Sequence, residues 1–311
     1  MITVLAGGVG AARFLQGLVR VVSPDKITVI VNTGDDVEFF GLHVSPDIDT
    51  VTYTLAGLVD ETRGWGVGGD TFHCLDSLKN LGYETWFNLG DRDLALHIHR
   101  TRLLREGLSL SQVTASFVSS FGLSLTILPM SDERVETRVN TDAGLLGFQE
   151  YMVKRGAKDR VTGIELAGVK EAHPTKGVIR AILEAQGIIL APSNPLISIG
   201  PILALKGVKE ALKDSSAKVL AISPIVGGAA LKGPADRMME GLGMEVSAYQ
   251  VAQLYSDFVD IFIMDNVDSG LKGRVESLGV QAILTDTIMK GLREKEALAS
   301  LAIAALEIKC R

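Results

Sequence analysis

The chain has 311 residues, of which 47% are hydrophobic, and a formal net charge of −6 at pH 7. This length suffices for one large domain or two ordinary ones, and the acidic balance argues against a nucleic-acid-binding protein, which normally presents a basic face. The two cysteines, Cys74 and Cys310, cannot build a disulfide framework or a thiolate metal cluster. We find neither a basic leader region nor an apolar run long enough for a membrane span, so we expect a cytoplasmic protein.

Short runs of branched apolar residues alternate with longer segments of helical periodicity. The short runs predict strands buried on both faces, at Ile2–Leu5, Ile27–Val31, Leu125–Leu128, Ile188–Leu190, Val219–Ile222, Ile261–Met264 and Ala282–Leu284. The helical periodicity predicts helices at Ala11–Val22, Asp49–Leu58, Ser111–Phe121, Lys176–Ala185, Val246–Val259 and Thr287–Ile308. Such alternation is typical of an α/β fold with a mostly parallel sheet and helices on both faces.

Residues 133–160 depart from this alternation. The stretch ERVETRVNT alternates polar and apolar residues, which predicts a small antiparallel α+β excursion from the main sheet. We therefore expect a single domain over residues 1–311, with an inserted lid or subdomain around residues 131–172. Whether this insertion covers a site or contacts a second subunit stays open.

The first predicted strand ends in a glycine-rich turn, LAGGVGAARFL. Gly7, Gly8 and Gly10 would let a ligand approach the backbone amides, and the positive end of the following helix suits a phosphate or another anion. The pattern is not a dinucleotide fingerprint, because Arg13 stands where G-x-G-x-x-G counted from Gly8 needs its last glycine. Tight packing of a strand against a helix also requires glycine, so this turn alone leaves both interpretations open.

Four aspartates crowd into VNTGDDVEFFGLHVSPDIDT, the segment that includes the end of the second predicted strand. They are Asp35, Asp36, Asp47 and Asp49. Helix capping explains one of them, since Asp47 is well placed to precede the helix predicted from Asp49. Like charges about 4 Å apart repel by roughly 1 kcal/mol in water and by more in a cleft. Because Mg²⁺ binds one or two carboxylates together with phosphate oxygens, we predict a magnesium site with Asp49 and Asp36 as ligands.

Further polar or glycine-rich loops follow other predicted strands. LPMSDER follows the third strand, and APSNPLISIGPIL follows the fourth, with Ser193 and Asn194. SPIVGGAALKGPADRMM follows the fifth, with Gly227, Gly228 and Lys232. Ligands of parallel sheets bind beyond the carboxyl ends of the strands, so we expect these loops to converge on one crevice.

The segment NLGDRDLALHIHRTRLLREG predicts a helix that starts at Asp91. Arg92, in its first turn, is the best candidate in this segment for contacting a ligand. The later arginines are interpreted as a solvated or ion-paired face: Arg100, Arg102 and Arg105. His97 and His99 are two residues apart and so lie on different sides of a helix, which argues against a zinc pair.

Seven motifs, in this order, resemble the 2-phospho-L-lactate transferase (CofD) family. They are GGVGAARFLQGL, VNTGDD with SPDIDT, RGWG, LGDRDLALH, LPMSDERVET, APSNPLISIGPIL and SPIVGGAALKGPADRMM. The spellings GGVGAARFL and RGWG are closest to bacterial members. The resemblance spans nearly the whole chain and implies a Rossmann-like fold, usually as a homodimer.

Membership of this family would imply a magnesium-dependent transferase of a substituted phosphate group in coenzyme F-420 biosynthesis. In that reaction a ribityl hydroxyl of the deazariboflavin FO (7,8-didemethyl-8-hydroxy-5-deazariboflavin) attacks a guanosine diphosphate ester of phospholactate, or of phosphoenolpyruvate in many bacteria, and GMP leaves. The family's FO-contacting aspartate falls on Asp49 and its basic partner on Arg92, both also expected to be catalytic. The nucleotide would be met more loosely by Gly7, Gly8, Gly10, Asn32, Ser193, Asn194, Gly227 and Gly228.

Two other functions compete with this interpretation. A related branch of the superfamily comprises regulatory proteins that bind nucleotide sugars without known catalysis, but we do not expect PDIDT together with GDRD in that branch. A nucleotide-dependent oxidoreductase is disfavoured by the missing third glycine and by Asn32, which stands where an acidic residue is expected. We therefore expect a transferase, and we expect Asp49→Ala to abolish transfer while leaving the fold intact.

Overall fold

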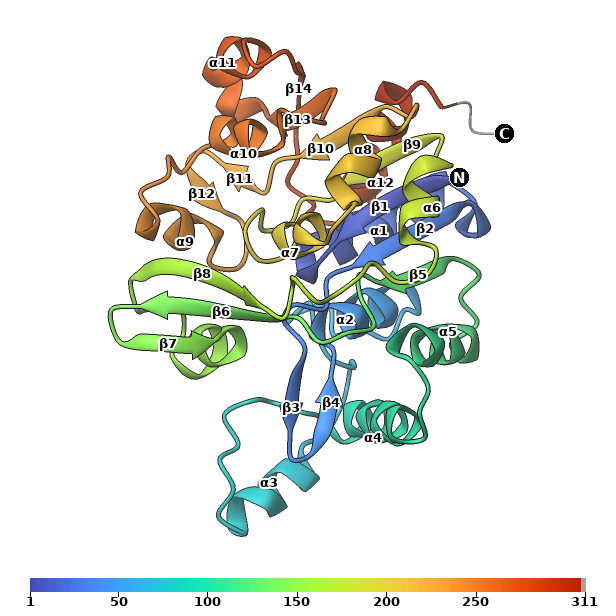
Figure 1. The fold of residues 1–311 in the computed structure, drawn as a ribbon, viewed down its shortest axis with the longest axis vertical. Helices are drawn as coiled ribbons and strands as arrows, with labels where there is room; N and C mark the ends of the chain where they lie inside the picture. Colours follow the sequence, from blue (N-terminus) through green and yellow to red (C-terminus); the bar gives the residue numbers. More distant parts are fainter. Residues whose placement is uncertain (309–311) are drawn as a thin grey trace.

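A computed structural model describes residues 1–308 of the chain. Seven strands form one sheet in the order β14-β13-β10-β9-β1-β2-β5, and every neighbouring pair is parallel (Figure 1). Their bounds are β1 Ile2–Ala6, β2 Ile27–Val31, β5 Thr126–Pro129, β9 Gly187–Leu190, β10 Val219–Ile222, β13 Ile261–Asp265 and β14 Gln281–Thr285. All seven predicted strands are confirmed. Burial on both faces holds for β1, β2, β9, β10 and β13, whereas the edge strands β5 and β14 are only partly buried.

Helices cover both faces of the sheet, as expected for an α/β fold. One face packs against α1 (Gly8–Val21), α2 (Pro46–Leu55), α5 (Leu110–Ser120) and α12 (Leu292–Ala305). The other packs against α6 (Val178–Leu183), α7 (Gly200–Ala204), α8 (Val208–Asp214), α10 (Ala248–Tyr255) and α11 (Lys272–Glu276). Neighbouring strand residues alternate between the two cores, so Val4 belongs to the first and Leu5 to the second.

The strand order makes the sheet Rossmann-like. In chain order the strands first run outward from β1 through β2 to β5, and the chain then returns to place β9 on the other side of β1. The direction of winding therefore reverses between β1 and β9. Ligands of such sheets bind in the crevice beyond the carboxyl ends of the strands at this switch point.

The predicted antiparallel excursion is a three-stranded sheet of β6 (Glu136–Thr141), β7 (Gly144–Gly147) and β8 (Val161–Ala167). A π-helical turn, η2 (Glu150–Lys154), follows β7. This sheet has its own small core, in which Val139 and Tyr151 pack with Met238 of α9 (Ala235–Gly241). The excursion is therefore anchored to the segment that follows β10 (Figure 1).

Two short hairpins and several helical segments complete the described chain. Strands β3 (Val37–Phe39) and β4 (Leu42–Val44) form a hairpin that projects from the main sheet towards α3 (His73–Asn80) and α4 (Asp91–Arg105) (Figure 1). Strands β11 (Ile225–Val226) and β12 (Ala229–Ala230) form the second hairpin. The 3₁₀ turns are η1 (Pro24–Lys26) and η3 (Asn266–Leu271). No helix within residues 1–308 is long and apolar enough to cross a membrane.

Helix α2 begins three residues earlier than the pattern predicts. Its N-cap is Ser45 and Pro46 takes the first helical position, where a proline loses no hydrogen bond and its fixed φ suits the helix. Asp47 and Asp49 therefore both lie inside the helix, and the interpretation of Asp47 as its cap is wrong. Acidic residues in a first turn also interact favourably with the positive end of the helix dipole.

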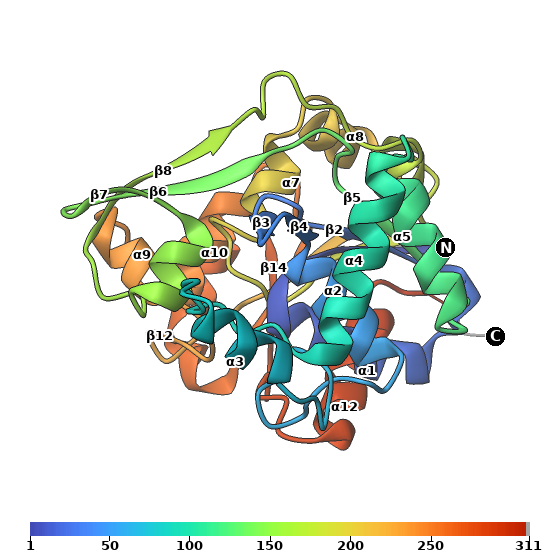
Figure 2. The ribbon, with the colours of Figure 1, turned by 90° about the horizontal axis from the view of Figure 1, so that it is seen from below.

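Helices α1 and α12 lie side by side beneath the sheet, and their contact depends on a glycine (Figure 2). A Cβ added to Gly17 would lie 2.2 Å from the backbone oxygen of Lys295.

We predict that Gly17→Ala lowers the free energy of unfolding by about 1–3 kcal/mol, since the helices must move apart. Gly273→Ala is the control, because an added Cβ in α11 meets nothing within 4 Å. Urea unfolding measures both, and wild-type stability of Gly17→Ala would contradict this packing.

Candidate functional site

The glycine turn after β1 lies against the loops that follow β2 and β9. Gly8 has a φ of +68°, in the left-handed region that favours glycine. A Cβ at Gly7 would lie 2.8 Å from Oδ2 of Asp47, and one at Gly10 would lie 2.2 Å from the carbonyl oxygen of Pro192. Close packing at the switch point thus accounts for these glycines. The same packing places the N-terminus of α1 there, which would suit an anion.

Asn32, the residue after β2, ties three of these segments together. Its buried Nδ2 donates to Oδ2 of Asp47 at 2.9 Å and to the carbonyl oxygen of Ile197 at 3.2 Å. Its Oδ1 accepts from the amide of Gly34 at 2.8 Å. A carboxylate at position 32 would instead face Asp47 and repel it, which explains why an amide suits this position.

The aspartates after β2 are buried beside one another. Burial raises the pKa of Asp47 to about 6, against the opposing hydrogen bond from Asn32. Burial, and then the charge of Asp47, raise the pKa of Asp35 well above its usual range. Among residues 1–308, Oδ1 of Asp35 and Oδ1 of Asp36 are buried without a hydrogen-bond partner. The cluster therefore holds oxygens that the described residues leave without a partner, and burial beside other carboxylates disfavours full ionisation.

Asp36 is held by one of its oxygens only. Its Oδ2 accepts from Oγ of Ser45 at 2.7 Å and lies 2.9 Å from Nε2 of His43. A cavity of about 250 Å³ opens beside it, lined also by Thr33, Glu38 and Arg134 among others. The side chain is thus oriented by β4 and the start of α2, and its second oxygen meets no donor from the described part of the chain.

Asp49 faces a buried arginine. Arg100 of α4 is completely buried, and its Nη1 donates to Oδ2 of Asp49 at 3.1 Å while its Nη2 donates to Oδ1. The guanidinium also lies 5.4 Å from the ring centre of Phe117 in α5. Burial raises the pKa of Asp49, and the charge of Arg100 opposes this shift. The pair joins α2, α4 and α5, and both carboxylate oxygens are engaged.

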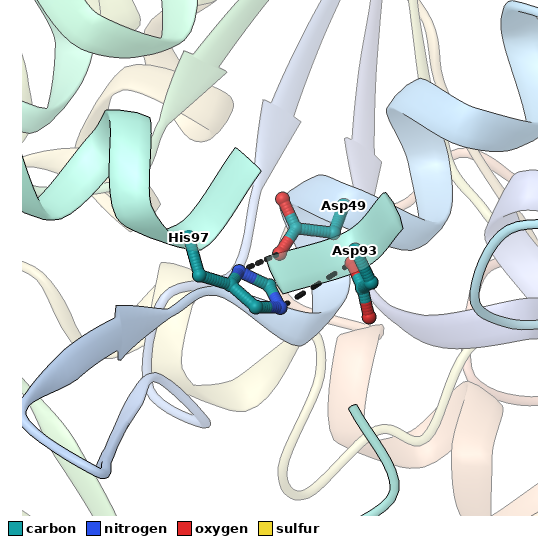
Figure 3. A group of neighbouring side chains, drawn as sticks. All are labelled: Asp49, Asp93 and His97. Atoms are coloured by element: carbon teal, nitrogen blue, oxygen red, sulfur yellow. Dashed lines mark ion pairs between the residues drawn. The ribbon is translucent and has the colours of Figure 1, made fainter. Parts of the chain in front are cut away.

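His97 extends this pair into a network. Figure 3 shows its ring between Asp49 and Asp93, with Nδ1 3.7 Å from Oδ2 of Asp49 and Nε2 3.3 Å from Oδ1 of Asp93. The hydroxyl of Tyr53 donates to the same Asp93 oxygen at 2.7 Å. The spacing of these three ligand atoms would suit a metal ion. The guanidinium of Arg100 already supplies the positive charge there, so we interpret the group as an ion-pair network.

Arg92 lies in the first turn of α4, as predicted, and its side chain is exposed. Asp70 holds this turn, because its carboxylate accepts from the amides of Arg92 and Asp93 at 2.9–3.1 Å. Asp91 in turn accepts from the amides of His73 and Cys74 at the start of α3. This reciprocal capping fixes the start of α4, the helix that carries both Arg92 and Arg100.

The two other glycine-rich and polar loops contribute differently. Ser193, after β9, is buried at the switch point, and its Oγ has no partner among residues 1–308. Asn194 accepts from the amide of Leu196 at 2.9 Å and so shapes the loop. Gly227 and Gly228 form the turn of the β11–β12 hairpin with φ of +58° and +79°. Such turns require glycine-like residues, which explains this pair without a ligand.

The structure brings together more residues than the sequence analysis singled out. Asn32 and Asp47 meet beside the glycine turn, and the charges of Asp36 and Asp49 act on Asp47 there. Gly227 instead donates its amide to Asp268 at 3.1–3.2 Å. His97 and the burial of Arg100 were missed. The signal was present, because Asp93 and His97 are four residues apart and therefore share one face of α4.

The chain is similar to known proteins over nearly its full length. The family model described as 2-phospho-L-lactate transferase CofD matches residues 2–298. A 2-phospho-L-lactate transferase of Methanosarcina mazei is 40% identical over 303 residues, covering 97% of this chain and 99% of that protein. A phosphoenolpyruvate transferase of Streptomyces griseus is 42% identical over 313 residues, covering 99% and 98%.

A solved structure of a UPF0052 family member from Bacillus halodurans has a similar fold. Its TM-score is 0.65 at 17% identity, covering 97% of this chain and 98% of that one. At this identity the likeness concerns the fold alone. The family model and the curated relatives span nearly the full chain, and the chain therefore belongs to the 2-phospho-L-lactate transferase (CofD) family.

Proposed function

We propose that this protein transfers a phospholactyl or enolpyruvyl phosphate group from its guanosine diphosphate ester to FO, in coenzyme F-420 biosynthesis. The observation that carries the proposal is the family match over residues 2–298, on a chain whose main sheet has a Rossmann-like strand order. A ribityl oxygen of FO would bond to the phosphorus that bears the lactyl or enolpyruvyl group. The bond from that phosphorus to the oxygen of GMP would break, GMP would take the electron pair, and the hydroxyl proton would be released.

The residues divide between the two substrates. Arg92 and Asp49 would meet FO, one from the exposed start of α4 and the other from the first turns of α2. The diphosphate would lie over the glycine turn of Gly7, Gly8 and Gly10, where the amides of α1 would stabilise its charge. Phosphoryl transfer needs positioning and charge neutralisation rather than a covalent nucleophile, so this arrangement suits the reaction.

Magnesium fits the acidic cluster by the chemistry of its donors. Asp36 presents a buried oxygen to which none of residues 1–308 donates, and carboxylate oxygen is a ligand that Mg²⁺ prefers. Asp49, the other expected ligand, would have to exchange one of its bonds from Arg100. When bound, the ion would neutralise the carboxylates and the diphosphate together. The Asn32 and His43 contacts keep Asp47 and Asp36 oriented in either case.

The lactyl and enolpyruvyl donors differ by one double bond. Relatives named for either group are similarly close, at 40% and 42% identity, so both esters belong in the assay. We also propose that the protein acts as a homodimer, by analogy with its family.

The direct test incubates the protein with FO, magnesium and each guanylated ester and follows GMP by chromatography. We expect GMP release with at least one ester. Arg92→Ala should lower kcat/KM for FO by about 10–100-fold, because a charged hydrogen bond is lost. Arg102→Ala, a change in the exposed arginine that pairs with Glu106 on the same helix, should leave turnover unchanged. No GMP from either ester would refute the transferase.

The buried ion pair between Asp49 and Arg100 changes the expected effect of Asp49→Ala on stability. Removing Asp49 leaves the guanidinium of Arg100 buried and unpaired, so the variant should lose about 3–5 kcal/mol of stability as well as transfer. The double variant Asp49→Ala, Arg100→Met should recover much of that stability without recovering transfer. Urea unfolding and GMP release measure the two effects separately. Recovery of turnover in the double variant would remove Asp49 from the chemistry.

Magnesium should stabilise the folded protein by binding it preferentially. We predict that the ion raises the thermal midpoint of the wild type, that chelation stops transfer, and that Asp36→Asn largely removes the thermal shift. Asp214→Asn, a change at an exposed position of α8, serves as the control and should keep the full shift. An unaltered shift in Asp36→Asn would place the ion elsewhere.

A further inference from the structure

Lys232 reaches a junction of three loops beside the first turn of α1. It lies after β12, yet its Nζ donates to the carbonyl oxygen of Arg63 at 3.3 Å, in the RGWG segment. A Cβ added to Gly64 would lie 3.2 Å from that Nζ and 2.9 Å from Cγ1 of Val9. The ammonium therefore stands close to Val9, the second residue of α1, although the two are more than 200 positions apart in sequence.

A second cation lies at the same place. Arg13 lines a small depression together with Val9 and Gly64. Arg13 stands four residues after Val9 and therefore lies on the same face of α1. Partial burial, and then repulsion by Arg13, lower the pKa of Lys232, which agrees with the proximity of the two charges.

This arrangement is unfavourable without an anion. Cations destabilise the N-terminal end of a helix, where the dipole is already positive. Among residues 1–308, the ion pairs within 4.0 Å include neither Arg13 nor Lys232, and the nearby Arg63 is paired with Asp60. Glu61 accepts from Gln16 and attracts Lys295 instead. Arg13 shares its depression with Glu61, but neither Arg13 nor Lys232 forms an ion pair among residues 1–308. Two such cations next to a helix N-terminus and a glycine turn fit a doubly anionic group.

We propose that Lys232 and Arg13 bind the diphosphate of the nucleotide donor at the start of α1. The identity of the donor rests on the proposed function, whereas the diphosphate site rests on the two cations and the turn. Lys232 would oppose the charge that develops on the departing GMP, and Arg13 would contact the neighbouring phosphate. Two cations discriminate a diphosphate from a monophosphate, so affinity should rise from guanosine through GMP to GDP.

Calorimetric titration of the full chain with GDP, GMP, guanosine and inorganic pyrophosphate tests this site. Lys232→Ala should lower the affinity for GDP and for pyrophosphate at least 10-fold and leave the affinity for guanosine unchanged. Lys232→Arg should retain most of the wild-type affinity. Lys209→Ala, a change in an exposed lysine of α8, is the matched control and should bind all four as the wild type does. Lys232 is exposed, so its variants should keep the wild-type thermal midpoint.

The readout requires no turnover. If GMP release fails while pyrophosphate binding still depends on Lys232, the transferase proposal is wrong and the diphosphate site stands. If Lys232→Ala binds GDP and pyrophosphate like the wild type, the site is refuted whatever the activity. An equal loss of affinity for guanosine and for GDP would also refute the site, because the lysine would then act on the nucleoside or on the fold.

Discussion

The repulsion among the carboxylates at the end of β2 is the constraint on which the rest of the site depends. Asp35, Asp36, Asp47 and Asp49 are all largely buried, where like charges interact more strongly than in water. The protein compensates them unequally. Arg100 neutralises Asp49 and Asn32 supports Asp47. Asp35 and Asp36 each keep a buried oxygen that has no partner within the described residues. A site that holds such charge without full compensation is suited to a cation and its anionic substrate.

The fold concentrates opposite charges on the two sides of one turn. Parallel strands deliver the aspartates after β2 and the glycine turn after β1 to the same edge of the sheet. Beyond that turn, Arg13 and Lys232 supply positive charge that the described ion pairs do not offset. A magnesium-bound diphosphate would compensate the aspartates and the two cations at once. Neither a purely structural role nor simple surface charge explains why both groups of charges occur beside this turn.

The main sheet could be predicted from the sequence because strands buried on both faces read as continuous apolar runs. The site could be predicted only in part. The β3–β4 hairpin was missed because its strands have three residues each, too few for a period to emerge. Arg100 was interpreted as part of a solvated or ion-paired face. The ion pair is confirmed, but the side chain is buried rather than exposed, because its partner Asp49 comes from α2. Gly227 and Gly228, which are loosely expected to meet the nucleotide, lie in a hairpin turn, and that position depends on strand pairing.

The most direct measurement of the central claim is the position of a divalent cation in crystals grown with GDP and Mn²⁺. Anomalous scattering would locate the ion without reference to any assumed mechanism. The account predicts a manganese peak beside the free oxygen of Asp36, with the diphosphate over Gly7–Gly10. A peak remote from the aspartates after β2, or a diphosphate bound away from the start of α1, would contradict it.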